Sequence, residues 1–274
     1  MLSATITFTR YNEPNWLVWE TLASLAGQQG VTCEILFLDQ QNDPATRAHI
    51  ASLSTSKLDF HYETIPAKCL SYARNYAIAQ AQHDTILYID SDAIAAPGWA
   101  CKLAEALDEP GVGVAGGRII PKWHARPLLI ARARFILDQY SMLDLGSDQK
   151  AVTRIVGANF GLRRDRLGAE AWFDESLGRR DGILFGGEDS DLCRRARQID
   201  LSVVYDGRAT VQHQILRERI RYRWIFKRLY YAGYGRAVQG GVPAPSQKMG
   251  LWDYIALPVV IPFYGLGYLK GRLS

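Results

Sequence analysis

Two carboxylates stand one residue apart in this sequence, directly after a short apolar run. Residues 86–89 favour a buried strand, and Asp90, Ser91 and Asp92 follow it. Because side chains at i and i+2 of an extended chain point the same way, Asp90 and Asp92 can converge at the carboxyl end of the strand, where open α/β sheets bind ligands. Their oxygens suit Mg²⁺ or Mn²⁺ and leave the ion room for phosphate oxygens. A solvated turn after a strand is the alternative explanation.

A second acidic pair, Glu188 and Asp189, follows Gly186-Gly187 and precedes a segment of helical character that begins at Asp191. A carboxylate within hydrogen-bond reach of a hydroxyl can act as a general base. Acidic residues also favour the positive end of a helix dipole. On the residues alone, the helix-end explanation is the simpler one.

Two polar side chains are expected at the ends of neighbouring elements. Asp39 follows the apolar strand Cys33 to Leu38, where it can meet a base or ribose or cap the next turn. Arg74 lies in the first turn of an alanine-rich helix, Lys68 to Gln82, where an anionic ligand would be stabilised by the free N–H groups. A surface arginine is the alternative.

A later strand, Arg154 to Gly161, contains small residues at Gly157 and Ala158. Close approach of the backbone to a sugar and tight packing against another strand explain them equally well. His213 follows an apparent strand, Leu201 to Tyr205, and a turn. A lone histidine is more often structural than a metal ligand.

The composition is that of an ordinary globular protein. The chain has 274 residues, 48% of them hydrophobic and 22% charged, with a formal net charge of +4, so it makes one large or two small domains. The four cysteines are widely spaced without a C-x-x-C pair, which predicts neither a zinc site nor a disulfide framework. Reduced thiols in a cytoplasmic chain are the simplest interpretation, and no signal peptide is expected.

Strands and helices alternate through the first hundred residues. The pattern predicts a strand at Ala4–Phe8, a helix after the turn at Pro14, a strand at Cys33–Leu38, a weak helix over 45–57, a strand at Phe60–Ile65, the helix of Arg74 and the strand before Asp90. This order is typical of βαβ units and a mostly parallel sheet. A glycine-broken strand at Val112–Ile120 follows, and residues 121–150 are expected to form a loop or helix beside the site.

Five short motifs, in order over roughly residues 3 to 236, resemble those of family 2 glycosyltransferases with the GT-A fold. They are Ile6-Thr7-Phe8-Thr9-Arg10-Tyr11-Asn12, Phe37-Leu38-Asp39-Gln40, Ala73-Arg74-Asn75, Asp90-Ser91-Asp92 and Gly186-Gly187-Glu188-Asp189. The usual proline of the first motif is replaced by Phe8 or Thr9, and Asp39 stands alone where the family usually has two adjacent aspartates. The implied fold is a Rossmann-like α/β fold, with a mostly parallel sheet flanked by helices.

The resemblance also implies an inverting, metal-dependent transferase of the bacterial surface-glycan type, which takes a sugar from a nucleotide-diphosphate donor, expected to be UDP-linked. Asp189 would be the catalytic base, and Asp92 and His213 would hold Mn²⁺ or Mg²⁺ directly, with Asp90 bonding the ribose or a metal-bound water. The implied donor-binding residues are Thr9, Tyr11, Asn12, Asp39, Arg74, Asp90 and Ser91, and the implied acceptor-side residues are Gly157, Asn159, Gly187 and Glu188.

The C-terminal part differs in composition from the rest. Residues 217–236 carry seven basic residues against the single acid Glu218, interleaved with aromatic residues, a pattern that suits an anionic membrane surface. One of these arginines can also grip the donor diphosphate. No nucleic-acid-binding motif accompanies them.

The uncharged segment Tyr254 to Tyr268 is broken by prolines and glycines and is shorter than the ~20 residues of a helical span, which predicts a hydrophobic hairpin or interfacial segment. Packing onto the catalytic domain is the alternative.

These features predict a catalytic domain over residues 1–215, with a nucleotide-sugar half of about 1–92 and an acceptor half of about 93–215, and an extension over 216–274. The expected acceptor is a hydroxyl on a lipid-linked or polysaccharide glycan. The expected location is cytoplasmic, peripheral on the inner face of the cell membrane. Two other functions stay open: a sugar nucleotidyltransferase, although its Gly-rich N-terminal signature is missing, and a non-catalytic sugar- or membrane-binding module.

Overall fold

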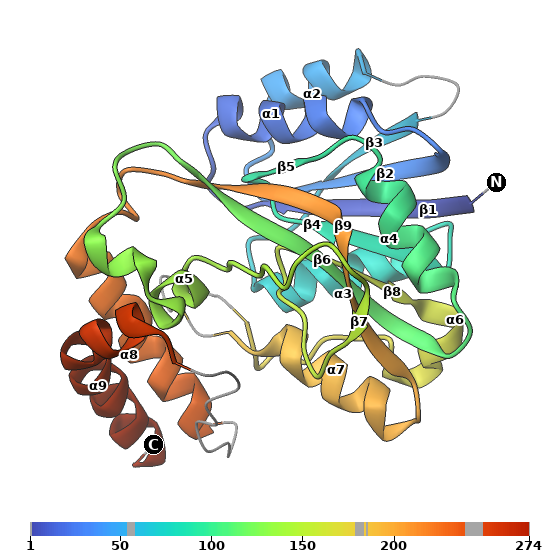
Figure 1. Cartoon of the computed structure of the whole chain (residues 1–274). Coiled ribbons are helices and arrows are strands. Elements are labelled where there is room, and N and C mark those ends of the chain that lie inside the picture. The colour runs from blue at the N-terminus through green and yellow to red at the C-terminus, as the bar shows by residue number, and fades with distance from the viewer. Residues whose placement is uncertain (1, 54–57, 179–183, 185, 239–248, 274) are drawn as a thin grey trace.

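A computed structural model describes residues 2–53, 58–178, 184, 186–238 and 249–273. Within these residues, nine strands form one mixed sheet in the order β3-β2-β1-β4-β8-β6-β9-β5, and β7 pairs with β9 (Figure 1). The strands are β1 (Leu2–Arg10), β2 (Val31–Asp39), β3 (Leu58–Thr64), β4 (Thr85–Ile89), β5 (Ala93–Ala95), β6 (Val112–Trp123), β7 (Lys150–Ala151), β8 (Asn159–Arg163) and β9 (Ser202–Ile215).

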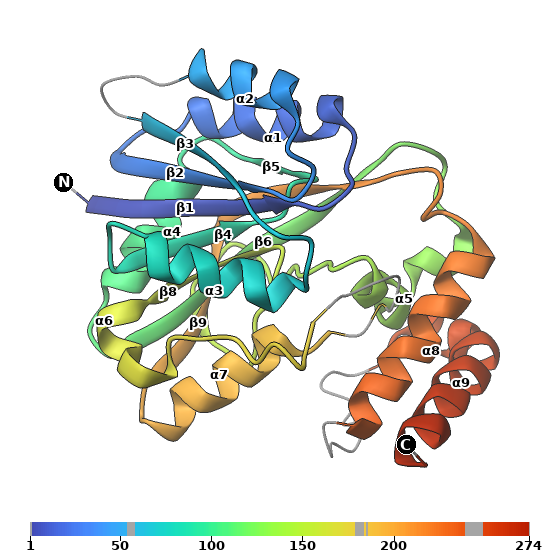
Figure 2. The ribbon, with the colours of Figure 1, turned by 180° about the vertical axis from the view of Figure 1, so that it is seen from behind.

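Helices cover both faces of this sheet. They are α1 (Asn15–Ala26), α2 (Pro44–Ala51), α3 (Leu70–Gln80), α4 (Trp99–Asp108), α5 (Arg134–Gln139), α6 (Arg164–Leu167), α7 (Glu188–Gln198), α8 (Tyr222–Val238) and α9 (Leu251–Arg272), with 3-10 turns η1 (Leu129–Arg132) and η2 (Gly168–Glu170). The helices α1, α2 and α4 lie on one face, whereas α3 and α7 lie on the other, which is seen in Figure 2. The α/β class predicted from the sequence is therefore confirmed.

The core has two parts, one on each face, because successive side chains of a strand point to opposite sides. In β2, Ile35 and Phe37 pack in the cluster that includes α1 and α4, whereas Leu36 and Leu38 pack in the cluster that includes α3 and α7. Strands buried on both faces read as continuous apolar runs, which is why β2 and β4 were recognisable in the sequence.

The first half of the sheet is parallel, as the βαβ pattern predicted. The pairs β1–β2, β2–β3 and β1–β4 are all parallel. The second half is mixed, because β8 runs antiparallel to both β4 and β6, whereas β6 and β9 are parallel. The short strands β5 and β7, which the sequence analysis missed, also pair antiparallel to β9.

Several predicted boundaries shift. The strand expected at Leu201 to Tyr205 and the turn expected before His213 form the single strand β9, whose pairing with β6 jumps from Gly117↔Asp206 to Arg118↔Thr210. The intervening residues are accommodated as an irregularity in the strand, so no reversal of the chain occurs. The strand expected from Arg154 begins only at Asn159, and α2 ends at Ala51, whereas part of the predicted helix, residues 54–57, lies outside the described residues.

The prediction of a hairpin within residues 254–268 is wrong, because this segment lies inside the 22-residue helix α9. Pro258 and Pro262 lie on its exposed side. Tight packing on α8 holds the helix: a Cβ atom on Gly267 would stand 1.8 Å from the carbonyl oxygen of Tyr230, and one on Gly233 would stand 2.0 Å from that of Tyr264. Tertiary contact thus outweighs the helix-breaking tendency of the two prolines.

The inner face of α9 joins the core of the rest of the chain. Ala256 and Val260 are buried in the same cluster as residues of α1 and α4. Asp253 accepts a hydrogen bond of 2.7 Å from the backbone N–H of Arg134 at the start of α5. None of the helices within the described residues has both the length and the hydropathy that a membrane span requires. The division of the chain at residue 215 stays a prediction.

We predict that Gly267→Ala loosens the contact between α8 and α9, because its Cβ would overlap backbone of α8 that cannot move as a flexible side chain can. The expected loss of unfolding free energy is about 1–3 kcal/mol. Gly265→Ala is the matched control, since a Cβ there meets nothing within 4 Å and alanine favours a helix. Urea unfolding followed by circular dichroism measures both. Equal stability of the two variants would contradict the described packing.

Candidate active site

The carboxyl end of β4 carries the two aspartates that the sequence singled out. Asp90 is half-buried and Asp92 is 4% exposed, in the short turn that leads to β5. Because Ala93 of β5 pairs with His213 of β9, this turn brings the aspartates to a histidine that is far away in the sequence. One ligand atom from each of Asp90, Asp92 and His213 lies within 4.8 Å of the others.

The hydrogen bonding of His213 indicates what this cluster can hold. Its Nδ1 lies 2.8 Å from the backbone carbonyl oxygen of Tyr140, which can only accept, so Nδ1 carries the proton. In the neutral imidazole the lone pair is then on Nε2, 3.1 Å from Oδ1 of Asp92. Two acceptors at this distance need a proton or a cation between them. An oriented imidazole beside carboxylate oxygens is a donor set that fits Mn²⁺ or Mg²⁺.

Arg219 completes the surroundings of Asp92. Its Nη1 lies 2.9 Å from Oδ2 of the buried Asp92, and the Arg219 side chain itself is 23% exposed. Burial lowers the pKa of Arg219, but Asp92, Glu13 and Asp90 raise it by more, so its pKa lies above the ordinary value. Arg219 belongs to the basic segment noticed in the sequence, where nothing distinguished it from its neighbours. Its role at the site is visible only in the structure.

Arg74 is buried, so the surface alternative for this residue is wrong. It donates to Oε1 of Glu188 at 3.1 Å and to the carbonyl oxygen of Gly157 at 3.0 Å. Its guanidinium lies 5.1 Å from the ring centroid of Phe160. Arg74 therefore joins the start of α3 to α7 and to the residues before β8. A small pocket lined by Arg74, Asp90 and Gly157, among others, opens beside it.

Asp189 lies in the first turn of α7, which begins at Glu188, three residues earlier than expected. Gly187 directly precedes this helix and has a φ of 114°, a left-handed conformation that favours glycine. The carboxylate accepts hydrogen bonds from the backbone N–H of Gly157 at 2.9 Å and of Ser190 at 2.7 Å. The half-buried Asp189 is thereby held beside the pocket that Gly157 lines, although its role as base stays a prediction.

Asp39 is fully buried and its carboxylate caps the turn after β2, which is one of the two roles expected from the sequence. It accepts hydrogen bonds from the backbone N–H groups of Gln41 at 2.8 Å and Asp43 at 2.9 Å. The hydroxyl of Tyr62 also donates to it, and burial together with Asp39 raises the pKa of Tyr62 to about 12. Contact of Asp39 with a base stays a prediction.

The other predicted residues divide into exposed and buried ones. Tyr11 and Asn12 are exposed at the turn after β1, and their backbone N–H groups donate to Glu13. Asn159 is fully buried, and its side chain bonds to Trp99 and to the backbone carbonyl oxygens of Arg118 and Ala209, which gives it a role in the core. Ser91 and Glu188 are also buried, and Thr9 lines the small pocket. Acceptor contacts of Gly157, Asn159, Gly187 and Glu188 stay predictions.

The sequence analysis missed Tyr140, which lies just after α5 and is 1% exposed. Its carbonyl oxygen orients His213, and its hydroxyl donates to the carbonyl oxygen of Arg219 at 3.1 Å. Its ring stacks on Trp224 of α8 with centroids 5.0 Å apart. No spacing within residues 121–150 pointed to it, because these contacts join residues far apart in the sequence.

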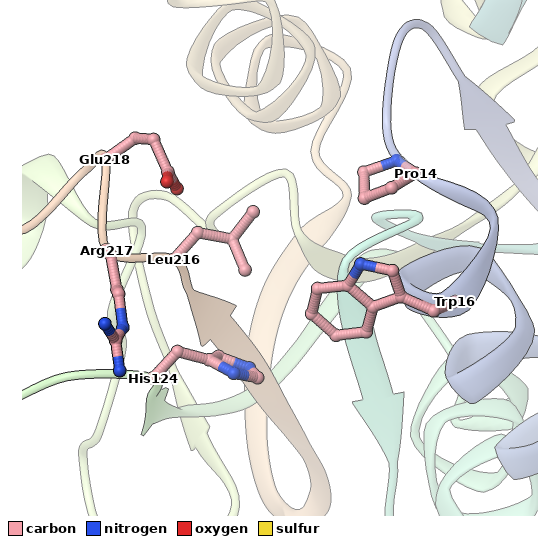
Figure 3. A pocket seen from close by; sticks show the side chains of 6 residues that line it. All are labelled: Pro14, Trp16, His124, Leu216, Arg217 and Glu218. Carbon is pink, nitrogen blue, oxygen red and sulfur yellow. The ribbon is translucent and has the colours of Figure 1, made fainter.

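A second, larger pocket of about 580 Å³ lies between the start of α1 and the chain after β9 (Figure 3). It is lined by Pro14 and Trp16 at the start of α1, His124 after β6, and Leu216, Arg217 and Glu218 after β9. His124 lies 2.9 Å from the side-chain oxygen of Gln214, whose backbone N–H donates to the carbonyl oxygen of Asp92. The pocket residue His124 is thus connected to Asp92 through Gln214.

This geometry, on this fold, defines a class of protein. The model of the family described as "Glycosyl transferase family 2" matches residues 5–168, and the chain belongs to that family. The predicted family is therefore confirmed, and the protein is a GT-A glycosyltransferase in fold.

Two curated relatives share part of their sequence with the chain. The "Glucosyl-dolichyl phosphate glucuronosyltransferase" of Haloferax volcanii is 26% identical over 172 residues, 62% of this chain and 55% of that protein. The "Pre-mycofactocin glycosyltransferase" of Mycobacterium tuberculosis is 27% identical over 168 residues, 59% of this chain and 33% of that protein. The chain thus matches about half or less of the length of these relatives.

Solved structures support the fold. A mannosyltransferase from Pyrobaculum calidifontis, PcManGT, in complex with GDP-Man and Mn²⁺, has a TM-score of 0.64 at 14% identity, covering 99% of this chain and 75% of its own. GalNAc-T7 with UDP, GalNAc and Mn²⁺ has a TM-score of 0.60 at 13% identity, covering 94% of this chain and 54% of its own. At such identities the likeness concerns the fold alone.

We predict that Mn²⁺ binds at the cluster and that Asp92→Ala abolishes this binding, because the substitution removes a buried oxygen ligand. Asp148→Ala, at an exposed position away from the cluster, is the control for the loss of one carboxylate. Titration with Mn²⁺ followed by electron paramagnetic resonance gives the affinity of each variant. Equal binding by Asp92→Ala and the unsubstituted protein would refute the assignment.

Proposed function

We propose that this protein is an inverting glycosyltransferase that moves a sugar from a nucleotide-diphosphate donor, with UDP as the expected nucleotide, to an acceptor hydroxyl. The observation that carries the proposal is the cluster of Asp90, Asp92 and His213 at the carboxyl end of β4, in a chain that belongs to family 2. Solved neighbours of the same fold are described as complexes with Mn²⁺ and with GDP-Man or UDP, which supports this choice of donor class.

The proposed roles follow the chemistry of the side chains. Asp92 and His213 would hold Mn²⁺ or Mg²⁺, with Asp90 beside them. A divalent ion there supplies Lewis-acid stabilisation of charge on the leaving diphosphate. The small pocket lined by Thr9, Arg74 and Asp90 is the proposed place of the part of the donor nearest the metal.

Asp189 is the proposed general base. The backbone N–H groups of Gly157 and Ser190 fix the direction of its carboxylate and leave further lone pairs for an acceptor hydroxyl. Taking the proton of that hydroxyl lets its oxygen attack the anomeric carbon from the face opposite the diphosphate. Direct displacement of this kind inverts the configuration, and correct positioning supplies much of the rate.

The proposed acceptor is a glycan on a lipid carrier at an anionic membrane surface, with the enzyme peripheral on the inner face of the cell membrane. One curated relative has a dolichyl phosphate in its name, which agrees with a lipid-linked acceptor. In this chain, large apolar side chains are exposed along α9: Leu251, Tyr254, Ile255, Ile261, Leu266 and Leu269. They recur at helical spacing on one side, whereas Lys270 and Arg272 follow at the end and Arg221, Arg223 and Lys227 are exposed on or near α8.

A face of this kind suits a helix that lies in the plane of the interface. Its apolar side would enter the boundary between headgroups and acyl chains, and each basic residue near an anionic surface contributes about 1 kcal/mol. The residues 216–274 would then act as a membrane-associating extension of a catalytic domain over 1–215. This arrangement would place the site close to an acceptor that cannot leave the bilayer.

We predict that Asp189→Asn binds the donor with nearly unchanged affinity but transfers the sugar ~10² times more slowly or worse, since the amide keeps the shape and loses the proton acceptor. A panel of nucleotide sugars identifies the donor, and release of the nucleoside diphosphate measures turnover. Release of pyrophosphate would indicate nucleotidyl transfer instead. Equal losses in donor affinity and in rate would assign Asp189 to binding or structure.

We also predict that the protein floats with anionic vesicles in a density gradient, and that high salt or neutral lipid reduces flotation. The double substitution Ile261→Glu and Leu266→Glu should abolish flotation, because it puts charge on the exposed side of α9. Ile199→Glu, at an exposed apolar residue after α7, is the control. If the unsubstituted protein stays at the bottom of the gradient at low salt, the membrane proposal is wrong.

A further inference from the structure

Asp92 contacts a basic side chain through each of its carboxylate oxygens. Oδ1 lies 3.1 Å from Nε2 of His213, and Oδ2 lies 2.9 Å from Nη1 of Arg219. Asp92 itself is 4% exposed, so both contacts lie almost out of reach of solvent at the carboxylate. The guanidinium of Arg219 thus stands where a positive charge is needed beside this buried carboxylate.

The charges around Arg219 make it a competitor of a metal ion. Glu13, Asp90 and Asp92 all act on its guanidinium. A divalent cation that enters the same group of carboxylates is repelled by the guanidinium, and buried like charges cost far more than exposed ones. Metal binding and the Arg219–Asp92 ion pair therefore oppose each other.

The chain around Arg219 borders an open pocket. The residue lies in the turn between β9 and α8, where its backbone N–H donates to Leu216 and its carbonyl oxygen accepts from Tyr140. The backbone is thereby anchored, and the long side chain extends from it to Asp92. On the other side of this turn, Leu216, Arg217 and Glu218 border the open pocket of Figure 3, so the turn has space beside it.

We propose that Arg219 is a diphosphate-binding residue that occupies Asp92 before the metal and donor arrive and transfers to the donor when they bind. This inference rests on the proposed function. A guanidinium displaced from Asp92 is stabilised by pairing with another anion. Its planar group of N–H donors can bind two phosphate oxygens at once. The diphosphate supplies that anion next to the same carboxylates, so no charge is left unpaired.

A thermodynamic consequence follows from this exchange. When the metal binds alone, part of its binding free energy is lost in displacing Arg219 from Asp92. When a nucleoside diphosphate is also bound, Arg219 gains a new partner and this loss is offset. Each ligand therefore strengthens the binding of the other by the same factor. A coupling of about tenfold or more is expected, within the usual range for linked sites. A nucleoside monophosphate lacks the second phosphate and should give little coupling.

The test measures Mn²⁺ affinity by electron paramagnetic resonance, without nucleotide and with UDP or UMP, and with GDP or GMP in parallel. In the unsubstituted protein, the diphosphate should raise Mn²⁺ affinity about tenfold or more and the monophosphate should not. In Arg219→Gln, Mn²⁺ alone should bind several-fold more tightly, and the enhancement by diphosphate should fall to the part that direct contact between metal and diphosphate supplies. Arg219→Lys, which keeps the charge without the fork, should give an intermediate enhancement.

Arg217→Gln is the matched control, since it removes the same charge two residues away, from an exposed side chain at the pocket. Equal Mn²⁺ affinities and equal enhancement in Arg217→Gln and Arg219→Gln would overturn the inference and leave the proposed function intact. Mn²⁺ binding that is independent of UDP and GDP in the unsubstituted protein would overturn the inference without any variant, and it would also contradict the metal–diphosphate contact of the proposed function. Absence of both metal and nucleotide binding would overturn the proposed function as well.

Discussion

The pairing of β5 with β9 is the constraint on which the site depends. Three residues, Ala93–Ala95, pair with β9 immediately after Asp92, and the register sets Ala93 opposite His213. Without this short ladder, the turn after β4 would hold two carboxylates with no nitrogen ligand and no fixed direction. With it, residues separated by more than a hundred positions meet in a buried cluster, and the cost of burying Asp92 is offset by His213 and Arg219.

Tyr140 extends this constraint to the C-terminal helices. The residue orients His213 through its backbone, holds the carbonyl oxygen of Arg219 through its hydroxyl, and stacks on Trp224 of α8. The start of α8 is therefore fixed by the same side chain that fixes the cluster. If α8 and α9 dock on a bilayer as proposed, their position bears directly on the residues around Asp92. Residues on both sides of the predicted division at residue 215 contribute to one hydrophobic cluster.

The helix α9 shows how two demands are met by one segment. Its inner side uses glycines, so that its backbone lies against that of α8, and Ala256 and Val260 fill the core. Its outer side leaves Ile261, Leu266 and other apolar residues exposed, an area that packing among the described residues does not cover. Small residues on one side and large apolar ones on the other explain why residues 254–268 are uncharged throughout. The prolines and glycines of this segment led to the prediction of a hydrophobic hairpin or interfacial segment.

The sequence by itself determined the α/β class, the parallel first half of the sheet, the positions of Asp90 and Asp92 at a strand end, and the family. These follow from local information: apolar runs of strand length, helical spacing, and motifs of a few residues read along the chain. Tertiary structure alone decided the rest. It joined β8 and β9 into the sheet as antiparallel and parallel strands, kept two prolines inside one helix, buried Arg74 against Glu188, and selected Arg219 and Tyr140 from residues that looked like their neighbours. The physical reason is that each of these outcomes is a contact between distant parts of the chain, whose energy depends on burial and on a charged or close-packed partner that local spacing does not reveal.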